Sequence, residues 1–502
     1  MKRVILALTV TSFACSGPSP MDGGTAGGGR AGGSAATGGG SAGGSGTGGS
    51  GGGGRAGGAG TAGGAMLPSP DGGWCGLPGS WVHDTDGGYH EVGLEDGGRY
   101  PYPPDSGLAS LNWLKLPPGF CVHQFANVGN SRQIRFAPGG ELFAASPTAA
   151  ATSTGTNGRA AIVVMPDDDR DGFADSVTNY RSGLGSTQGL MFFDGGFFFQ
   201  NGTFIMSEPY APGQRAPTGN PTPRLNIIVL IDSNHWPKTL DHDDTGRIFV
   251  TNGSNQGEQC ITSRPFKGGI VEMDGTDGGR QVAKGLRNAI YLRCHHDGNN
   301  RCFANELAKD YSAAQGGREK LIPVEDGDDW GYPCCAAQNL PYLDECLACT
   351  TPGTEALDAS TPICKVRNEC SPKCETTKPE SASFIIGDTP FGLDFIDNQF
   401  PPPWDHRVFV GVHGAFGSWA GARVVGVKFD PATGRVLAGG NLPLIDGGFD
   451  GGAMDDFLEG WDDLFNPRAH GRPTDVTVAP DGRLFISNDT NGEIFWVSPV
   501  GR

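Results

Sequence analysis

Apolar and polar residues alternate with a period of two along much of the chain, and turns rich in Asp, Gly and Pro separate the alternating runs. The segments "RQIRFAPGG", "GLMFFDGG", "GLDFIDNQ" and "DVTVAPDG" each join an apolar run to such a turn. This alternation predicts β-strands, and the turn residues predict hairpins between them. Helical periodicity is nearly absent, and "NELAKDY", residues 305–311, is the one short segment that we expect to be helical.

One strand pattern recurs along the chain, in which an Asp- or Gly-rich turn precedes an apolar residue and a phenylalanine. The phenylalanines are Phe143, Phe198, Phe249, Phe303, Phe409 and Phe485, and the first four are 51 to 55 residues apart. That spacing is the length of a four-stranded propeller blade with its loops. Phe303 and Phe409 are 106 residues apart. When about 50 of these residues are assigned to a Cys-rich insertion, the remainder has the length of one blade.

An all-β chain with this repeat must close radially or leave long exposed edges. We therefore predict a six-bladed β-propeller of four-stranded blades over residues 66–502, with the repeated phenylalanines in its core. Residues 16–65 are almost wholly Gly, Ala, Ser and Thr. They have too few apolar side chains to offset the entropy of ordering, so we expect a disordered tether.

The first fifteen residues, "MKRVILALTVTSFAC", consist of a basic start, a short apolar run and a small residue before Cys15. This layout predicts an export signal. The Ala14-Cys15 junction is similar to a bacterial lipobox, in which Cys15 is lipidated and holds the protein to an outer membrane or cell surface. Ser12 departs from the usual Leu, so an ordinary signal of a periplasmic or secreted protein remains the alternative.

Charge excludes one class of partner. The 502 residues include 37 basic and 55 acidic side chains, which gives a net charge of −18. No basic stripe is present to neutralise phosphates, so we expect no nucleic-acid partner.

Cysteine usage fits an exported protein. Of the 13 cysteines, twelve remain when Cys15 is set aside. An even number in an exported chain predicts disulfides. Cys294 and Cys302 flank a turn and can close a hairpin bridge. Residues 334–374 form a Cys-rich insertion that we expect to be oxidised, although Cys346, Cys349, Cys370 and Cys374 have spacings that also suit a zinc ribbon.

The segment "DDDRDGFAD", residues 167–175, has the composition of a calcium loop. Asp167, Asp169, Asp171 and Asp175 occupy its first, third, fifth and ninth positions, and Gly172 occupies the sixth. Alternating carboxylates suit a hard cation, and glycine permits the sharp turn. The closing Glu is replaced by Thr178. We predict calcium binding here, and the alternative is a solvated acidic hairpin.

Several motifs, in their order along the chain, carry a family resemblance. They are "LPPGFCVHQFA", "GLRNAIYL", "DDWGYPC", "FGLDFIDNQFPPPWDHRVFVGVHG" and "GRPTDVTVAPDGRLFISND". From about Leu116 onward, the insertion excepted, the sequence resembles the glucose/sorbosone dehydrogenase family of six-bladed propellers, which includes soluble quinoprotein glucose dehydrogenase. The resemblance implies pyrroloquinoline quinone (PQQ) and calcium on the propeller axis.

The same resemblance implies a site. The family's general base stands thirteen residues before the apolar residue of the turn-strand pattern, as His235 stands before Ile248. A base must take the substrate's hydroxyl proton while hydride leaves carbon, and from residue type alone we expect activity to rise through a pKa near that of imidazole. Arg287 and Asn288 match a family pair that contacts the quinone oxygens.

The resemblance implies further site positions, of which the match at Gln188 is the loosest. Arg472 matches an arginine that binds a cofactor carboxylate, and Gln188 falls where a glutamine lies on the substrate side. Two positions depart from the family: Thr474 stands where a second arginine is expected, and His413 where a quinone-binding lysine is expected.

These observations predict an exported, quinone-dependent dehydrogenase that oxidises a sugar or a related alcohol or aldehyde and passes electrons to an external acceptor. The alternative from another class is a non-catalytic cell-surface propeller that binds a protein or a glycan.

Overall fold

The computed structural model describes residue 70 and residues 73–94, 96–98, 100–102, 108–146, 161–226, 235–254, 268–274, 278–308, 317–332, 335–336, 374–415, 418–436, 454–462 and 469–502. They belong to one unit of the chain, Gly58–Arg502. The predicted signal with Cys15 and the predicted tether over 16–65 lie outside the described residues.

Six antiparallel sheets form the blades, and each begins with its innermost strand. Blade 1 contains β4 (Ile134–Phe136), β5 (Leu142–Ser146), β6 (Ala161–Met165) and β7 (Thr178–Arg181). Blade 2 contains β8 (Leu190–Phe193), β9 (Gly196–Asn201), β10 (Phe204–Pro209) and β11 (Thr222–Asn226). Blade 3 contains β12 (Leu240–His242), β13 (Ile248–Asn252), β14 (Gly269–Met273) and β15 (Gly279–Lys284), and β19 (Asp328–Asp329) pairs in parallel with β15.

The second half of the ring has the same order. Blade 4 contains β16 (Asn288–His295), β17 (Arg301–Leu307), β18 (Glu319–Pro323) and β20 (Ala382–Phe384). Blade 5 contains β21 (Pro390–Ile396), β22 (Arg407–Val412), β23 (Arg423–Asp430) and β25 (Met454–Leu458), with the short β24 (Arg435–Val436) also on β23. Blade 6 contains β26 (Arg472–Val478), β27 (Leu484–Asp489), β28 (Glu493–Pro499) and β3 (Phe120–Asn127), to which β1 (Trp81–His83) and β2 (Tyr89–Glu91) add an outer edge.

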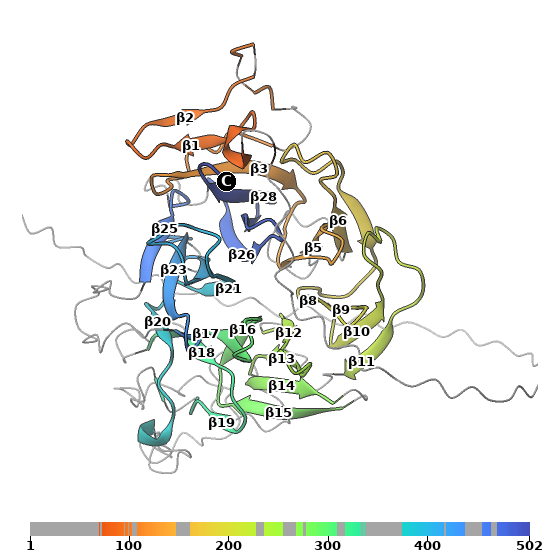
Figure 1. The fold of residues 1–502 in the computed structure, drawn as a ribbon. Helices are drawn as coiled ribbons and strands as arrows, with labels where there is room; N and C mark the ends of the chain where they lie inside the picture. The colour runs from red at the N-terminus through yellow and green to blue at the C-terminus, as the bar shows by residue number, and fades with distance from the viewer. Residues whose placement is uncertain are drawn as a thin grey trace, which may run out of the picture. The chain divides into compact units, whose positions relative to one another are not determined.

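The sheets surround a central axis (Figure 1). Their innermost strands contact one another in a closed order, β4, β8, β12, β16, β21, β26 and back to β4. The ring is sealed by β3, which pairs with β28 and so joins the start of the propeller to its end. This pairing removes two free strand edges that would otherwise be open to aggregation. The predicted six-bladed propeller is confirmed, and three of the blades carry extra edge strands.

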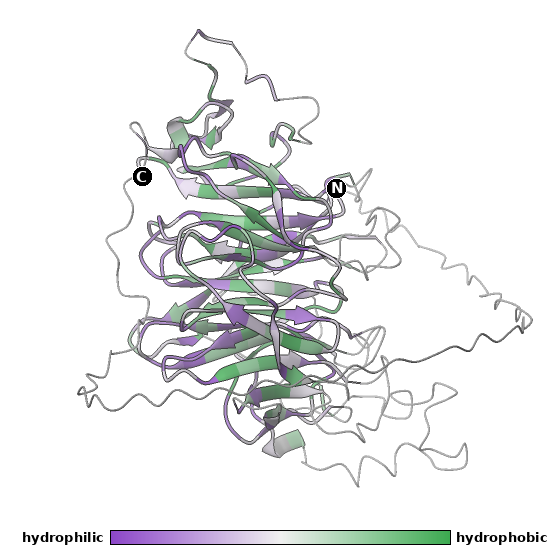
Figure 2. Cartoon of the chain, turned by 90° about the vertical axis from the view of Figure 1, so that its right-hand side faces the viewer, coloured by the Kyte–Doolittle hydropathy of each residue, from purple (hydrophilic) through white to green (hydrophobic). Residues whose placement is uncertain are grey.

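The repeated phenylalanines lie on the second strand of each blade, as the repeat predicts. Five of the six are buried in the core between blades, where each contributes about 1.5–3 kcal/mol of hydrophobic stabilisation. Phe198 is the exception, because its neighbours Phe197 and Phe199 on β9 point inward instead and leave it only half-buried. Figure 2 shows these apolar stretches within the strands.

The insertion begins and ends between the third and fourth strands of blade 4. A disulfide joins Cys335 to Cys374 and so links the two ends of the insertion. Cys374 is therefore not a zinc ligand, while Cys346, Cys349 and Cys370 lie outside the described residues. The predicted hairpin bridge between Cys294 and Cys302 is confirmed, and a third disulfide joins Cys75 to Cys121.

The prediction of a helix over residues 305–311 is wrong for residues 305–308, the part that the structure describes. Asn305–Leu307 completes β17, because pairing with β16 and β18 on both sides outweighs the local helical preference. The helices of the described residues are two short 3₁₀ turns, Trp74–Gly76 and Cys374–Thr376. Among these residues no helix has the length and hydropathy needed to cross a membrane.

Candidate functional site

The predicted site residues gather at one end of the propeller axis. Strands in each blade are antiparallel, so the start of the first strand and the end of the second share one face. His235 precedes β12, Gln188 precedes β8, and Asn288 and Arg472 begin β16 and β26. His413 directly follows β22, the second strand of blade 5. The topology therefore brings the predicted site residues of blades 2 to 6 together at this face.

His235 is a buried residue held by the loop that follows β13. The residue is only 5% exposed, and its Nδ1 is 3.1 Å from the carbonyl oxygen of Ser254. A carbonyl only accepts, so Nδ1 carries the ring proton and Nε2 holds the lone pair. Burial, helped by the charge of Arg287, lowers the pKa of His235 to about 3. The imidazole-like pKa expected from residue type is wrong, and the ring stays neutral throughout the physiological range.

A glycine allows His235 and Asn288 to approach each other. A Cβ placed on Gly253 would lie 2.4 Å from the Cβ of His235 and 2.9 Å from the Oδ1 of Asn288. Both side chains therefore occupy space that any other residue at position 253 would fill. The Oδ1 of Asn288 is buried without a hydrogen-bond partner, so it is available to a ligand.

Hydrogen bonds to and from the backbone fix the residues around His235 and Asn288. The amide of Ser254 donates to the carbonyl of Arg287 at 2.6 Å, and the amide of Arg287 donates to Glu306 at 2.9 Å. Lys238 is 2% exposed and its Nζ donates to the carbonyls of residues 235, 236 and 237, the first at 2.7 Å. Lys238 thus fixes the loop that carries His235.

A second group of charged residues forms at blades 5, 6 and 1. Arg472 makes a two-point contact with the buried carboxylate of Asp489, at 3.1 and 2.9 Å. The Nη1 of Arg132, in the loop before β4, lies 3.7 Å from the same carboxylate. These cations and a hydrogen bond from His413 hold the pKa of Asp489 far below its usual range, against the effect of burial. Two arginines and one carboxylate leave a net positive charge here.

His413 does not replace the charge of a lysine. Burial, together with the charge of Arg472, lowers its pKa to about 3, so it is neutral. Its Nε2 donates to Asp489 at 3.0 Å, and its ring stacks on Phe391 with centroids 4.0 Å apart. Thr474 is fully buried and its hydroxyl donates to backbone carbonyls. The loop that carries Arg132 therefore lies beside Thr474, through the hydrogen bond to the carbonyl of Ser131.

Gln188 and Tyr291 also have buried polar atoms without a hydrogen-bond partner. Gln188 donates to the carbonyl of Ile290 at 3.3 Å, while its Oε1 is buried without a partner. The hydroxyl of Tyr291 is also buried without a partner, and the charges of Arg132 and Asp489 act on it. Buried polar atoms without partners mark positions where a bound molecule can complete the hydrogen bonding.

Sequence reasoning missed Arg132, Lys238, Gly253 and Asp489. Arg132 had a usable signal, because it precedes an innermost strand in "SRQIRF" as Arg287 does in "GLRN". Lys238 acts through local contacts with residues 235–237 that the sequence pattern does not reveal, and Gly253 and Asp489 act through contacts between separate loops.

The acidic loop lies at the opposite face, between β6 and β7. Oxygens of Asp167, Asp169 and Asp171 come within 4.8 Å of one another, whereas Asp175 accepts a hydrogen bond from the backbone of Asp168. Gly172 has a φ of 90°, as the sharp turn requires. Burial raises the pKa of Asp167 to about 6. Three of the four predicted ligands are thus together.

Comparison with solved structures identifies the fold. The structure aligns with a calcium structure of a Trichoderma reesei family AA12 carbohydrate-active enzyme at a TM-score of 0.57 and 16% identity, over 77% of this chain and 97% of the other. This chain shares its fold. The holo form of the PQQ domain of pyranose dehydrogenase from Coprinopsis cinerea aligns at a TM-score of 0.56 and 16% identity, with the same coverage. No family model matches the sequence, and no curated protein matches it.

Proposed function

We propose that this protein is a PQQ-dependent dehydrogenase that oxidises a sugar or a related alcohol or aldehyde. The observation that carries the proposal is the convergence of His235, Arg287 and Asn288 around Gly253 at the propeller axis. A buried histidine that is neutral at physiological pH keeps a free ring nitrogen that can accept a hydroxyl proton. The fold shared with the PQQ domain of pyranose dehydrogenase supports this cofactor.

The residues present fit an anionic tricarboxylate quinone. Three arginines, Arg132, Arg287 and Arg472, contribute positive charge at this end of the axis, and the buried carboxyl groups of Asp489 and Glu306 offset part of it. Arginine binds carboxylates through two parallel hydrogen bonds. Arg472 and Arg132 would hold the cofactor carboxylates, and Arg287 with Asn288 would contact the quinone oxygens. Calcium is part of the same proposal, which the calcium structure of the family AA12 enzyme supports.

A bound PQQ supplies the acceptor for the two electrons that the substrate gives up. His235 accepts the substrate's hydroxyl proton at Nε2, because Nδ1 donates to the carbonyl of Ser254. Lys238 keeps the loop in place by holding three successive carbonyls. The buried amide oxygen of Gln188 is available to orient a substrate hydroxyl.

The experiment is reconstitution of the purified chain with PQQ and calcium, followed by dye-linked oxidation of a panel of sugars and alcohols. His235→Ala removes the base, so turnover should fall by about 10²- to 10⁴-fold while PQQ still binds. Arg472→Ala should instead weaken PQQ binding, because a carboxylate loses a charged partner. Full activity in His235→Ala would refute the assignment of the base.

Failure of the wild-type chain to bind PQQ would refute the enzyme proposal as a whole. The non-catalytic propeller that binds a protein or glycan would then be the better account.

Export and anchoring belong to the same proposal. Three disulfides among the described residues support an oxidising compartment. We place the protein outside the cytoplasm, attached to a membrane through a lipid on Cys15, with an external electron acceptor. The acidic loop of Asp167, Asp169 and Asp171 is a second calcium site that stabilises the fold away from the axis end where the chemistry occurs.

A further inference from the structure

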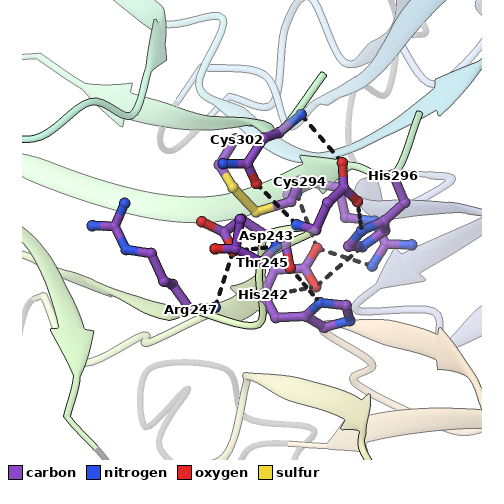
Figure 3. The surroundings of a disulfide bond; sticks show 11 residues. His242, Asp243, Thr245, Arg247, Cys294, His296 and Cys302 are labelled. Atoms are coloured by element: carbon purple, nitrogen blue, oxygen red, sulfur yellow. Dashed lines mark hydrogen bonds and ion pairs between the residues drawn. A yellow bond between two sulfur atoms is a disulfide. The ribbon is translucent and has the colours of Figure 1, made fainter. Parts of the chain in front are cut away.

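A cluster of two histidines and one aspartate lies at the face opposite the candidate site. Asp241 and His242 end β12 of blade 3, and His296 follows β16 of blade 4. One ring nitrogen of each histidine and one carboxylate oxygen of Asp241 all lie within 4.8 Å of one another. Figure 3 shows His242 and His296 side by side near the Cys294–Cys302 disulfide, and their ring centroids are 4.5 Å apart.

The contact between Asp241 and His296 is too long for a hydrogen bond. The Nε2 of His296 lies 3.9 Å from the Oδ1 of Asp241. A hydrogen bond requires about 3 Å, whereas two ligands at 2.0–2.1 Å from a tetrahedral zinc ion lie roughly 3.3 Å apart. Small rotations of the three side chains would bring the ligand atoms to that separation.

The tautomer of His296 is fixed by a carboxylate. Its Nδ1 lies 3.2 Å from the Oδ1 of Asp244, which only accepts, so Nδ1 carries the proton and the lone pair of Nε2 faces Asp241. Asp244 is itself held by the backbone amides of Gly298 and Asn300, at 3.1 and 3.2 Å. A carboxylate that orients a histidine in this way is the usual outer partner of a metal-bound imidazole.

Asp241 is likewise fixed from the side away from the histidines. Its Oδ2 accepts from Arg293 at 3.2 Å and from the amide of Cys294 at 3.0 Å. The guanidinium of Arg293 is shared with Asp394, at 3.0 Å. The charge of Arg135 also acts on Asp241 and Asp394, and Arg135 is itself paired with Asp475 at 2.9 Å. The four acidic groups Asp241, Asp244, Asp394 and Asp475 therefore outnumber the two arginines, so the surroundings favour a bound cation.

A disulfide also fixes the position of one of the three side chains, His296. The Cys294–Cys302 disulfide joins facing residues of β16 and β17 and so closes the turn that carries His296. The ligands come from two blades, so an ion here would tie blade 3 to blade 4.

We propose that Asp241, His242 and His296 bind one divalent transition-metal ion of the zinc class, with water completing its coordination. Imidazole nitrogens favour such ions over calcium, which takes oxygen ligands. The site is independent of the proposed dehydrogenase chemistry, because it lies at the other end of the inner strands.

The test is titration of the chelator-stripped full chain with Zn²⁺ or Co²⁺ in excess Ca²⁺, which occupies oxygen-only sites such as the acidic loop. We expect one ion to bind and the thermal midpoint to rise. His242→Ala and His296→Ala should each lower the affinity about 100-fold or more, and Asp244→Asn should lower it about 10- to 100-fold. The matched control is His90→Ala, which removes an exposed histidine paired with Asp84 at 3.0 Å and should change nothing.

Bound Co²⁺ should show visible absorption without a thiolate charge-transfer band, which distinguishes this site from the Cys-rich insertion. Absence of one-to-one binding in the wild type would overturn the proposal. So would unchanged affinity in both histidine variants, because the ion would then lie elsewhere. Should the alanine variants fail to fold, His296→Gln keeps a polar side chain of similar length, and unchanged affinity in that variant would also overturn it.

Discussion

Replacing Gly253 by alanine tests the geometry of the candidate site directly. The added Cβ would lie 2.4 Å from the Cβ of His235, while ordinary contacts are 3.4–4 Å. The nearest atom belongs to the rigid root of the side chain, so His235 must move by at least about 1 Å. Gly253 does not have a positive φ, so the effect is steric and not a result of backbone strain.

A displacement of about 1 Å at a catalytic group costs on the order of 10²-fold in rate, or about 3 kcal/mol of transition-state stabilisation. We therefore expect Gly253→Ala to lower dye-linked turnover about 100-fold. Overpacking should also lower the free energy of unfolding, by about 1–3 kcal/mol.

The assay compares turnover, PQQ binding and thermal unfolding of Gly253→Ala with those of Gly411→Ala. A Cβ on Gly411 meets its nearest neighbour at 3.8 Å, so this variant should behave as the wild type. Wild-type turnover in a folded Gly253→Ala protein would refute the close packing of His235 and Asn288 against Gly253, on which the site is built.

The other predictions concern protonation, calcium and anchoring. Burial raises the pKa of Glu319 to about 8, so the stability of the wild type falls as pH rises from about 4.5 to 8. Glu319→Gln cannot ionise, and its stability relative to wild type should grow by up to about 1.4 kcal/mol per pH unit across that window in denaturant titrations; a pH-independent difference would contradict this. The lowered pKa of His235 predicts that kcat/KM stays level between about pH 5 and 7 and falls only in stronger acid, whereas a fall near pH 6.5 would show a solvated base. Calcium should raise the thermal midpoint of the quinone-free protein, and Asp169→Ala with Asp171→Ala should remove most of that rise; an unchanged wild-type midpoint in excess calcium argues for a solvated hairpin. Cys15→Ala should move the protein from the membrane to the soluble fraction, and a wholly soluble wild type would exclude the lipid anchor.

The propeller could be predicted from the sequence because its information is local and repeated. Each turn with its following phenylalanine specifies one hairpin, and period-two alternation specifies which side chains enter the core. Six such units close radially or leave long exposed edges, so a closed ring is the arrangement that their number favours. The failure at Phe198 has the same origin, since three successive phenylalanines leave the register ambiguous and only packing between blades selects Phe197 and Phe199.

The candidate site was predictable only where a residue has a fixed place relative to a strand. His235, Arg287 and Arg472 could be found in this way, because each stands at or just before the start of an innermost strand. What surrounds them was decided by the tertiary structure. The pairing of Arg132 and Arg472 on Asp489 joins residues more than 300 positions apart.

The protonation states also came from the fold alone. From residue type alone, a histidine is expected to have a pKa near that of free imidazole. Burial beside Arg287, which only the fold creates, lowers the pKa of His235 to about 3. The cluster of Asp241, His242 and His296 has no metal-binding spacing in the sequence, since His296 lies 54 positions after His242. It exists because closure of the ring places the ends of β12 and β16 side by side. Sequence therefore determined the blades and their number, and the closed ring determined which distant side chains share one environment.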